Sequence, residues 1–186
     1  MHNKIIQHSH SSSLIVLDRD GVINQDTPHF VKSPEEFIFL PGSLEAIQRL
    51  TAAEYPIGIA TNQSGIGRGY LSEESLSQIH QKMLQAILQQ GGQIRDIAYC
   101  PHVPNDHCDC RKPKPGLLEH LAQSTNKSVE NIIFIGDRLS DLKTAEQAGS
   151  QFILVRSSMT EAHIEASYPH ILKFDSLLET VNHLLG

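Results

Sequence analysis

The sequence predicts an α/β fold, with a doubly wound, mostly parallel sheet that carries helices on both faces. Two observations predict it: short aliphatic runs recur along the chain, and stretches with the spacing of amphipathic helices separate them. Strands joined by helices run in the same direction, and the parallel sheet that results is covered on both sides. With 186 residues, the chain is long enough for one such domain with its own hydrophobic core.

The predicted strands are short segments in which nearly every residue is apolar. An alternating pattern would place one face in solvent, whereas a continuous apolar run indicates a strand that is buried on both faces. We expect the sheet to form from five such runs: LIVL (14–17), IGIA (57–60), IAY (97–99), IIFI (132–135) and FILV (152–155).

Helices are predicted between and after these strands. Ser43 and Ser72 are predicted N-caps, and a glutamate follows each in the first turn, where it faces the positive end of the helix dipole. We expect Gly91 or Gly92 to end the second helix and Gly149 to end the fourth. The predicted segments are 43–54, 72–92, 116–126, 138–149 and roughly 176–185.

Composition narrows the class of protein. No apolar segment is long enough to span a membrane, and a net charge of −6 disfavours a general nucleic-acid binder, which would carry a basic surface. Residues 1–13 lack the apolar region of a secretory signal, and their His and Ser content predicts a flexible tail. We expect residues 14–186 to form a single domain. The protein is expected to be a cytoplasmic monomer that binds neither membrane nor nucleic acid.

The three cysteines lie together in the segment CPHVPNDHCDC, residues 100–110. An odd number of cysteines cannot all pair internally, and a reducing compartment favours thiolate ligands over disulfides. With one histidine they complete a four-donor set typical of structural Zn²⁺, which should fold the loop rather than take part in chemistry. The predicted ligands are Cys100, His102, Cys108 and Cys110, with His107 as the alternative to His102.

Polar side chains follow three of the predicted strands. Asp18 and Asp20 come after the first strand, and Thr61 opens the segment TNQSG after the second. Asp137 follows the strand at 132–135. Each taken alone could be a turn residue or a helix cap. Because ligands bind at the carboxyl ends of parallel strands, their joint occurrence favours one site for phosphoryl transfer.

These residues suggest distinct roles in such a site. Asp18 and Asp137 are expected to hold Mg²⁺, which prefers oxygen ligands, and Asp18 to attack phosphorus and form an aspartyl-phosphate. Asp20 would protonate the leaving oxygen and later deprotonate the attacking water, so we expect its environment to raise its pKa. Thr61 and the backbone N–H groups of 61–64 would hydrogen-bond the phosphoryl oxygens.

A basic pair supplies the positive charge that a transferring phosphoryl group requires. Arg111 and Lys112 follow the cysteine segment and precede the predicted helix from Gly116, a position that favours anion binding. In an arbitrary loop such a pair would more often be an ordinary surface pair. We assign Lys112 to the transferring phosphoryl group. Arg111, with its bidentate fork, is assigned to the substrate's other anionic group or to a hydroxyl.

The motifs DRDGVIN, TNQSGIGRG, CPH…CDCRKPKPG and GDRLSD together resemble the haloacid dehalogenase (HAD) superfamily, over about residues 14–156. Within it they are similar to the group of heptose bisphosphate and histidinol phosphatases. The resemblance implies a Rossmann-like domain and Mg²⁺ held by Asp18, Asp137 and the Asp20 backbone carbonyl. The candidate substrate contacts are Asp26, His29, Asn62, Gln63, Ser64, Arg111 and Arg138.

The expected activity is that of a Mg²⁺-dependent phosphoric monoester hydrolase acting on the C7 phosphate of D-glycero-D-manno-heptose 1,7-bisphosphate. The stretches 21–60 and 62–111 leave no room for a large cap domain, so the site should be open to a small phosphorylated sugar. Histidinol phosphate is the nearest alternative; Asp26 would suit it and Arg111 would oppose it. A nucleic-acid 3′-phosphatase is disfavoured by the net charge. A non-catalytic, zinc-stabilised phospho-acceptor would have no task for Asp20.

Overall fold

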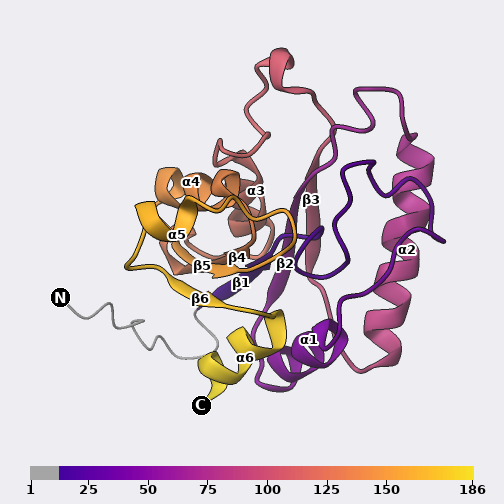
Figure 1. Cartoon of the computed structure of the whole chain (residues 1–186). Coiled ribbons are helices and arrows are strands. Elements are labelled where there is room, and N and C mark those ends of the chain that lie inside the picture. Colours follow the sequence, from indigo (N-terminus) through magenta and orange to yellow (C-terminus); the bar gives the residue numbers. More distant parts are fainter. Residues whose placement is uncertain (1–12) are drawn as a thin grey trace.

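The sheet is six-stranded and parallel throughout in the computed structural model, which describes residues 13–186 (Figure 1). The strands are β1 (Leu14–Leu17), β2 (Ile57–Asn62), β3 (Asp96–Cys100), β4 (Ile132–Gly136), β5 (Gln151–Val155) and β6 (Leu172–Phe174). Their order across the sheet is β3-β2-β1-β4-β5-β6. The predicted doubly wound sheet is confirmed, and its strand order reverses between β1 and β4.

Helices cover both faces of this sheet (Figure 1). The apolar residues of α1, α2 and α6 share one core cluster with the sheet, and those of α3 share another with Ala145 of α4, while Leu142 of α4 packs in a third, smaller cluster. The bounds are α1 (Ser43–Ala52), α2 (Glu73–Gln89), α3 (Gly116–Ser124), α4 (Leu139–Ala148), α5 (Ile164–Ser167) and α6 (Leu177–Leu185), with 3₁₀ turns at Pro104–Asp106 and Val129–Asn131.

Strand β1 lies between the two core layers. Ile15 and Leu17 belong to the cluster under α1, α2 and α6, whereas Leu14 and Val16 belong to the cluster under α3 and α4. Successive side chains of a strand point to opposite faces, and because both faces are covered by helices all four are fully buried. Burial of each contributes roughly 1.5–3 kcal/mol to stability, so β1 is a rigid base for the residues that follow it.

The predicted helix ends are confirmed in part. The Ser72 side chain caps α2 by accepting a backbone N–H at 3.0 Å. Gly149 ends α4 with a left-handed φ of 72°, and Gly91, with φ 81°, follows the end of α2. The prediction for Ser43 is wrong, because Gly42 takes the N-cap position and the Ser43 hydroxyl donates to a backbone carbonyl at 2.9 Å.

The C-terminal part contains two short elements that were not predicted, β6 and α5. The three residues of β6 are all half-buried, and a lysine lies between its two apolar residues, so the run carries little periodic signal. Of the predicted tail over 1–13, residues 1–12 lie outside the described part of the chain, and Ser13 is buried directly before β1. Among the described residues, no helix combines the length and the apolar character that a membrane crossing needs.

Candidate active site

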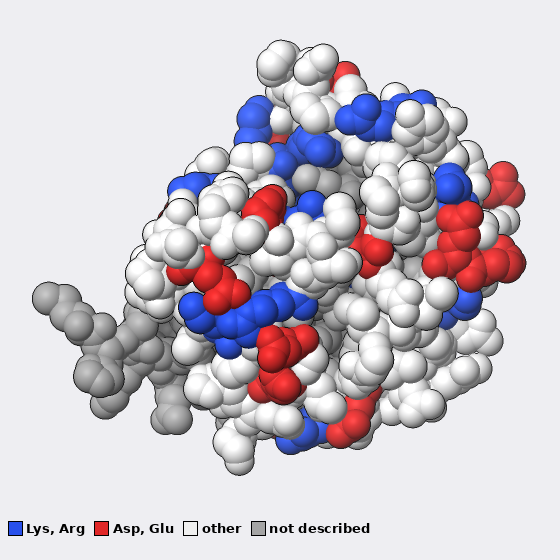
Figure 2. Space-filling model, in the orientation of Figure 1, with Lys and Arg blue, Asp and Glu red and all other residues white. Residues whose placement is uncertain are grey.

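The candidate active site lies at the carboxyl edge of the sheet, at the neighbouring strands β1 and β4 between which the strand order reverses. Leu17 is aligned with Ile135 across these strands, so Asp18 and Asp137 begin two adjacent loops. Ligands of parallel α/β sheets bind in the crevice beyond such a reversal of strand order. A cavity of about 460 Å³ opens there. Lys and Arg side chains gather around a hollow on this side of the molecule (Figure 2).

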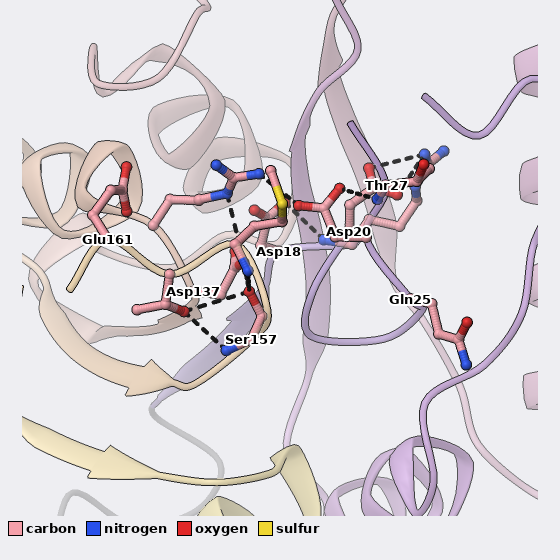
Figure 3. Close-up of polar contacts among 12 residues, drawn as sticks. Asp18, Asp20, Gln25, Thr27, Asp137, Ser157 and Glu161 are labelled. Carbon is pink, nitrogen blue, oxygen red and sulfur yellow. Dashed lines mark hydrogen bonds and ion pairs between the residues drawn. The ribbon is translucent and has the colours of Figure 1, made fainter. Parts of the chain in front are cut away.

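Three buried carboxylates face one another beside this cavity. One oxygen from each of Asp18, Asp137 and Asp141 lies within 4.8 Å of the other two, and Figure 3 shows Asp18 and Asp137 close together. Burial raises the pKa of Asp18 well above its usual value; the neighbouring acids add to this and Lys112 opposes it. Burial and Asp141 likewise raise the pKa of Asp137 to about 7. The cluster therefore favours an added positive charge.

The donor set fits a hard divalent cation. Asp137 Oδ1 is buried without a hydrogen-bond partner among the described residues, whereas Oδ2 accepts the Ser157 hydroxyl at 2.5 Å. Gly21, with a φ of 85°, packs so closely on Asp137 that any Cβ at this position would overlap the carboxylate. A free carboxylate oxygen among other carboxylates is what a Mg²⁺ site offers, since Mg²⁺ prefers oxygen ligands.

Lys112 is the cation that the chain itself places in this cluster. Its ammonium lies 2.9 Å from Asp18 Oδ2 and 2.7 Å from Asp141 Oδ1, and it donates to the Ala60 carbonyl at 3.1 Å. Burial would lower the pKa of Lys112, but the carboxylates of Asp141 and Asp18 outweigh it and raise the pKa. Lys112 is therefore a fixed, buried positive charge beside the Asp18 carboxylate.

Asn62 holds the backbone of Lys112 in place. Its side-chain oxygen accepts the Lys112 N–H at 3.1 Å, and its amide donates to the Lys112 carbonyl at 3.2 Å. Asn62 lines the cavity, where it was predicted to contact substrate, yet its observed partners belong to the chain. These bonds tie the end of β2 to the segment that follows the zinc loop, residues 100–110.

The prediction of a raised pKa for Asp20 is wrong in this arrangement. Its carboxylate accepts two bonds from Arg19 Nη2, both at 2.9 Å, one from Asn24 at 2.8 Å and one from Gln63 at 2.9 Å. Burial would raise the pKa of Asp20, but Arg19 and these hydrogen bonds outweigh it and lower the pKa. The sequence did not indicate that three donors from separate positions would meet at this one acid.

The structure brings most of the other candidate residues to the cavity. Its lining includes Thr61, Asn62, Gln63, Ser64, Asp26, Arg111 and Arg138. The exception is His29, which is exposed and does not line the cavity. The Thr61 hydroxyl accepts the Gln63 amide at 2.8 Å, which leaves its own proton free to donate to a ligand.

One part of the cavity wall is acidic and internally paired. Arg138 lies 2.6 Å from Asp26 and 3.6 Å from Asp137, and these carboxylates raise the pKa of Arg138 against the effect of burial. Glu161 also lines the cavity and accepts the Leu139 N–H at 3.1 Å. The charge of Arg138 is therefore largely compensated within this wall.

Arg111 is in a different situation. It lines the cavity, and its Nη1 donates to the backbone carbonyl of His102 at 3.1 Å. Within the described part of the chain it forms no ion pair. Its orientation is thus set by the zinc loop, and its charge is available to an anionic ligand.

Sequence reasoning missed Asp141 and Glu161. Asp141 stands in the motif GDRLSD, four residues after Asp137, and its Oδ2 accepts the backbone N–H groups of Asp137 and Arg138 at 3.2 and 3.0 Å. An acid at that spacing in the first turn of a helix could have been recognised as a partner of the same site. Glu161 lies in the loop after β5, where no motif marks it.

The four predicted zinc ligands meet in the structure. Their ligand atoms lie within 4.8 Å of one another, with Cys100 Sγ 3.0 Å from Cys110 Sγ and 3.6 Å from Cys108 Sγ. His102 Nδ1 lies 3.3 Å from Cys110 Sγ, and His107 is not part of the group. Donors about 2.0–2.3 Å from a shared ion lie at comparable separations in a tetrahedral site. Three thiols and one imidazole therefore fit structural Zn²⁺.

A family model described as HAD-hydrolase-like matches residues 109–182. The D-glycero-beta-D-manno-heptose-1,7-bisphosphate 7-phosphatase of Pseudomonas putida is 41% identical over 173 residues, covering 92% of this chain and 99% of that protein. Its counterpart from Bordetella bronchiseptica is 49% identical over 144 residues, covering 77% and 80%.

A solved structure supports the same relationship. The crystal structure of D,D-heptose 1,7-bisphosphate phosphatase from B. bronchiseptica, complexed with magnesium and phosphate, matches with a TM-score of 0.84 at 42% identity. The match covers 93% of this chain and 98% of that one. The similarity therefore extends over the sheet, the cavity and the zinc loop together.

Proposed function

Because the chain belongs to the D-glycero-beta-D-manno-heptose-1,7-bisphosphate 7-phosphatase family of HAD-like hydrolases, we propose that it hydrolyses the 7-phosphate of this sugar bisphosphate with Mg²⁺. The observation that carries the proposal is the buried Asp18–Lys112–Asp141 arrangement, with Asp137 beside it, at a cavity. A nucleophilic carboxylate, a fixed cation and a metal-binding acid are the groups that phosphoryl transfer needs.

Asp18 is the proposed nucleophile. One of its carboxylate oxygens attacks phosphorus, the bond between phosphorus and O7 of the sugar breaks, and an aspartyl-phosphate forms. Lys112, 2.9 Å from Asp18 Oδ2, compensates the negative charge of the phosphoryl oxygens. The Thr61 hydroxyl, oriented by Gln63, donates a hydrogen bond to one of these oxygens.

Asp20 is the proposed acid and base. The lowered pKa of Asp20 means that it must gain its proton in the complex, and the negative charge of a bound phosphate favours this by raising the pKa. Asp20 then donates the proton to O7 as the sugar leaves. In the second step it removes a proton from the water that attacks phosphorus, which releases phosphate and restores the Asp18 carboxylate.

The side chains of Asp18 and Asp137 and the backbone carbonyl of Asp20 would hold Mg²⁺, which when bound compensates the negative charge that gathers at the phosphoryl group. Asp141 has other partners, because its Oδ1 pairs with Lys112 and its Oδ2 accepts two backbone N–H groups at the start of α4. We therefore assign Asp141 to the placement of Lys112.

The two parts of the cavity wall suggest how a bisphosphate is oriented. Arg111 makes no ion pair within the described residues and can bind the second phosphate. The wall of Asp26, Arg138 and Glu161 is paired and acidic, so it suits sugar hydroxyls better than a phosphate. Zn²⁺ at the four-ligand cluster would hold Arg111 in this orientation, since Arg111 is bonded to the loop at His102. We propose a cytoplasmic monomer that acts on this small substrate.

A phosphate-release assay of the purified protein with Mg²⁺ tests the proposal. The substrates are the heptose 1,7-bisphosphate, the corresponding 7-monophosphate and histidinol phosphate. We expect kcat/KM for the bisphosphate to exceed that for the monophosphate by about 10-fold or more, the contribution of one charge-assisted contact. Arg111→Ala should remove this preference, while Arg95→Ala, at an exposed position directly before β3, should keep it. Highest activity on histidinol phosphate would contradict the proposal.

A further inference from the structure

We propose that His80 is a positioning residue, which acts through the buried Arg19 to hold the Asp20 carboxylate in place for its proton transfers. The inference rests on the acid–base role proposed above for Asp20. The proposal adds a series of buried contacts that runs from His80 on α2, on one side of the sheet, through Arg19 to the catalytic acid Asp20.

Arg19 is an unusual residue for the interior of a protein. Its side chain is only 1% exposed, whereas arginine is almost never fully buried unless paired. Nη2 binds both oxygens of Asp20 at 2.9 Å, and the guanidinium lies 5.9 Å from the centre of the Phe37 ring. Nε has no hydrogen-bond partner among the described residues. The guanidinium therefore has few contacts that fix its direction.

His80 supplies the contact on the far side of the guanidinium. Its Nε2 lies 3.4 Å from Arg19 Nη1. Because a guanidinium only donates hydrogen bonds, Nε2 must present its lone pair, so the imidazole is neutral and carries its proton on Nδ1. Burial and the charge of Arg19 lower the pKa of His80 to about 4, which keeps Nε2 an acceptor at neutral pH.

His80 is itself held by packing. It lies on the buried face of α2 together with Leu76, Ile79 and Met83, and its ring makes a T-shaped contact with the Tyr99 ring, with centroids 6.1 Å apart. The Tyr99 hydroxyl donates to Glu73, in the first turn of α2, at 2.6 Å. These contacts link α2 to β3 beside the point from which His80 reaches Arg19.

By holding the guanidinium of Arg19, His80 would also hold the direction in which the Asp20 carboxylate points. Proton transfer requires a well-aligned contact with the leaving oxygen, and such contacts weaken steeply as the angle departs from linear. Two of the four hydrogen bonds to Asp20 come from Arg19, so a guanidinium that turned towards another acceptor would leave the Asp20 carboxylate held only by Asn24 and Gln63. Removal of the acceptor at position 80 should therefore impair the steps that use Asp20 and spare the others.

The leaving group provides a selective test. A sugar alkoxide needs a proton to depart, whereas the p-nitrophenolate of p-nitrophenyl phosphate does not. Since kcat/KM reports the steps up to the first irreversible one, we expect His80→Leu to lower kcat/KM for the sugar phosphate by about 10–100-fold and for p-nitrophenyl phosphate by less than about 3-fold. His80→Gln, which retains an acceptor oxygen, should restore most of the loss.

Controls separate this inference from instability and from failure of the proposed function. Met83→Ala, on the same buried face of α2, should reduce stability without a dependence on the leaving group. Should His80→Leu fail to fold, Arg19→Lys keeps the charge but cannot bridge His80 and Asp20, and the same selective loss is expected. Equal losses for both substrates in the folded variants would overturn the role of His80.

Asp20→Asn is the reference variant. If its loss does not depend on the leaving group, the acid–base assignment of Asp20 fails and this inference fails with it. If Asp20→Asn shows the dependence and the folded variants at positions 80 and 19 do not, only the inference about His80 fails.

Discussion

The carboxylate cluster and the zinc loop both suit a metal ion, but they are assembled in opposite ways. The zinc loop takes its four ligands from residues 100–110, and three of them are partly exposed. The carboxylate cluster joins Asp18, Asp137 and Asp141, all buried, from two strand ends and a helix. It also contains its own cation, Lys112. The comparison teaches that one site is assembled by the fold from distant segments, whereas the other gathers its donors within one short loop, which a bound ion would hold together.

The largest expected effect is at the nucleophile of the carboxylate cluster. Asp18→Asn keeps the shape of the side chain but removes the charged attacking oxygen, so we expect kcat to fall by about 10⁴-fold or more. The fold should persist, because the change relieves repulsion among three clustered acids. Phosphate release and the unfolding midpoint are the measurements. A rate near that of the wild type would exclude a covalent role for Asp18.

The next effect tests whether Lys112 is an integral part of the cluster. Lys112→Met leaves the buried carboxylates of Asp18 and Asp141 without their cation, so we expect a loss of about 3–5 kcal/mol in the free energy of unfolding. Activity should fall by about 10²–10³-fold. Urea unfolding without metal measures the first effect.

Lys114 offers a matched control for that substitution. It lies two residues further on and pairs with Asp109 on the surface, so Lys114→Met should change stability far less. Equal losses of stability in the two variants would contradict a stabilising role for the buried ion pairs of Lys112.

When no metal is bound, the stability of the protein should depend on pH through the carboxylate cluster. Asp137 has a pKa of about 7 in the folded protein and an ordinary value of 3.8. Between these values the folded protein holds a proton that the unfolded chain releases, so its stability should fall as pH rises through this window, by at most about 4 kcal/mol. The melting temperature against pH in a chelator measures the slope, which Asp137→Asn and added Mg²⁺ should each reduce. A slope that neither change alters would contradict this origin.

The smallest predicted effect is on substrate binding through the zinc loop. Chelation of Zn²⁺, or Cys110→Ser, should loosen residues 100–110 and with them Arg111, which is bonded to the loop at His102. We expect KM for the bisphosphate to rise by about 10-fold while kcat changes little. Metal analysis and steady-state kinetics are the measurements. Unchanged kinetics in a zinc-free protein would remove the loop's role in substrate binding.

The same contrast explains what could be predicted from the sequence. The zinc ligands follow one another within a short segment, and the strands β1 and β4 are continuous aliphatic runs, so local pattern was enough for both. Asp18 and Asp137 could be placed together because parallel strands end at one edge. The environment of Asp20 could not, since Gln63 is brought to it from the loop after β2 only by packing, while Asn24 lies four residues further along its own loop. Short half-buried elements such as β6 also escape periodicity.

Rapid acid quenching during turnover, followed by mass spectrometry of the peptide that contains residue 18, tests the central claim most directly. The account predicts a phosphoryl group on Asp18 in the protein supplied with Mg²⁺ and substrate, and its absence in Asp18→Asn. An Asp20→Asn variant should still show the adduct with p-nitrophenyl phosphate, because loss of the base slows its hydrolysis. Full turnover with no phosphoryl group on Asp18 at any time would contradict the account.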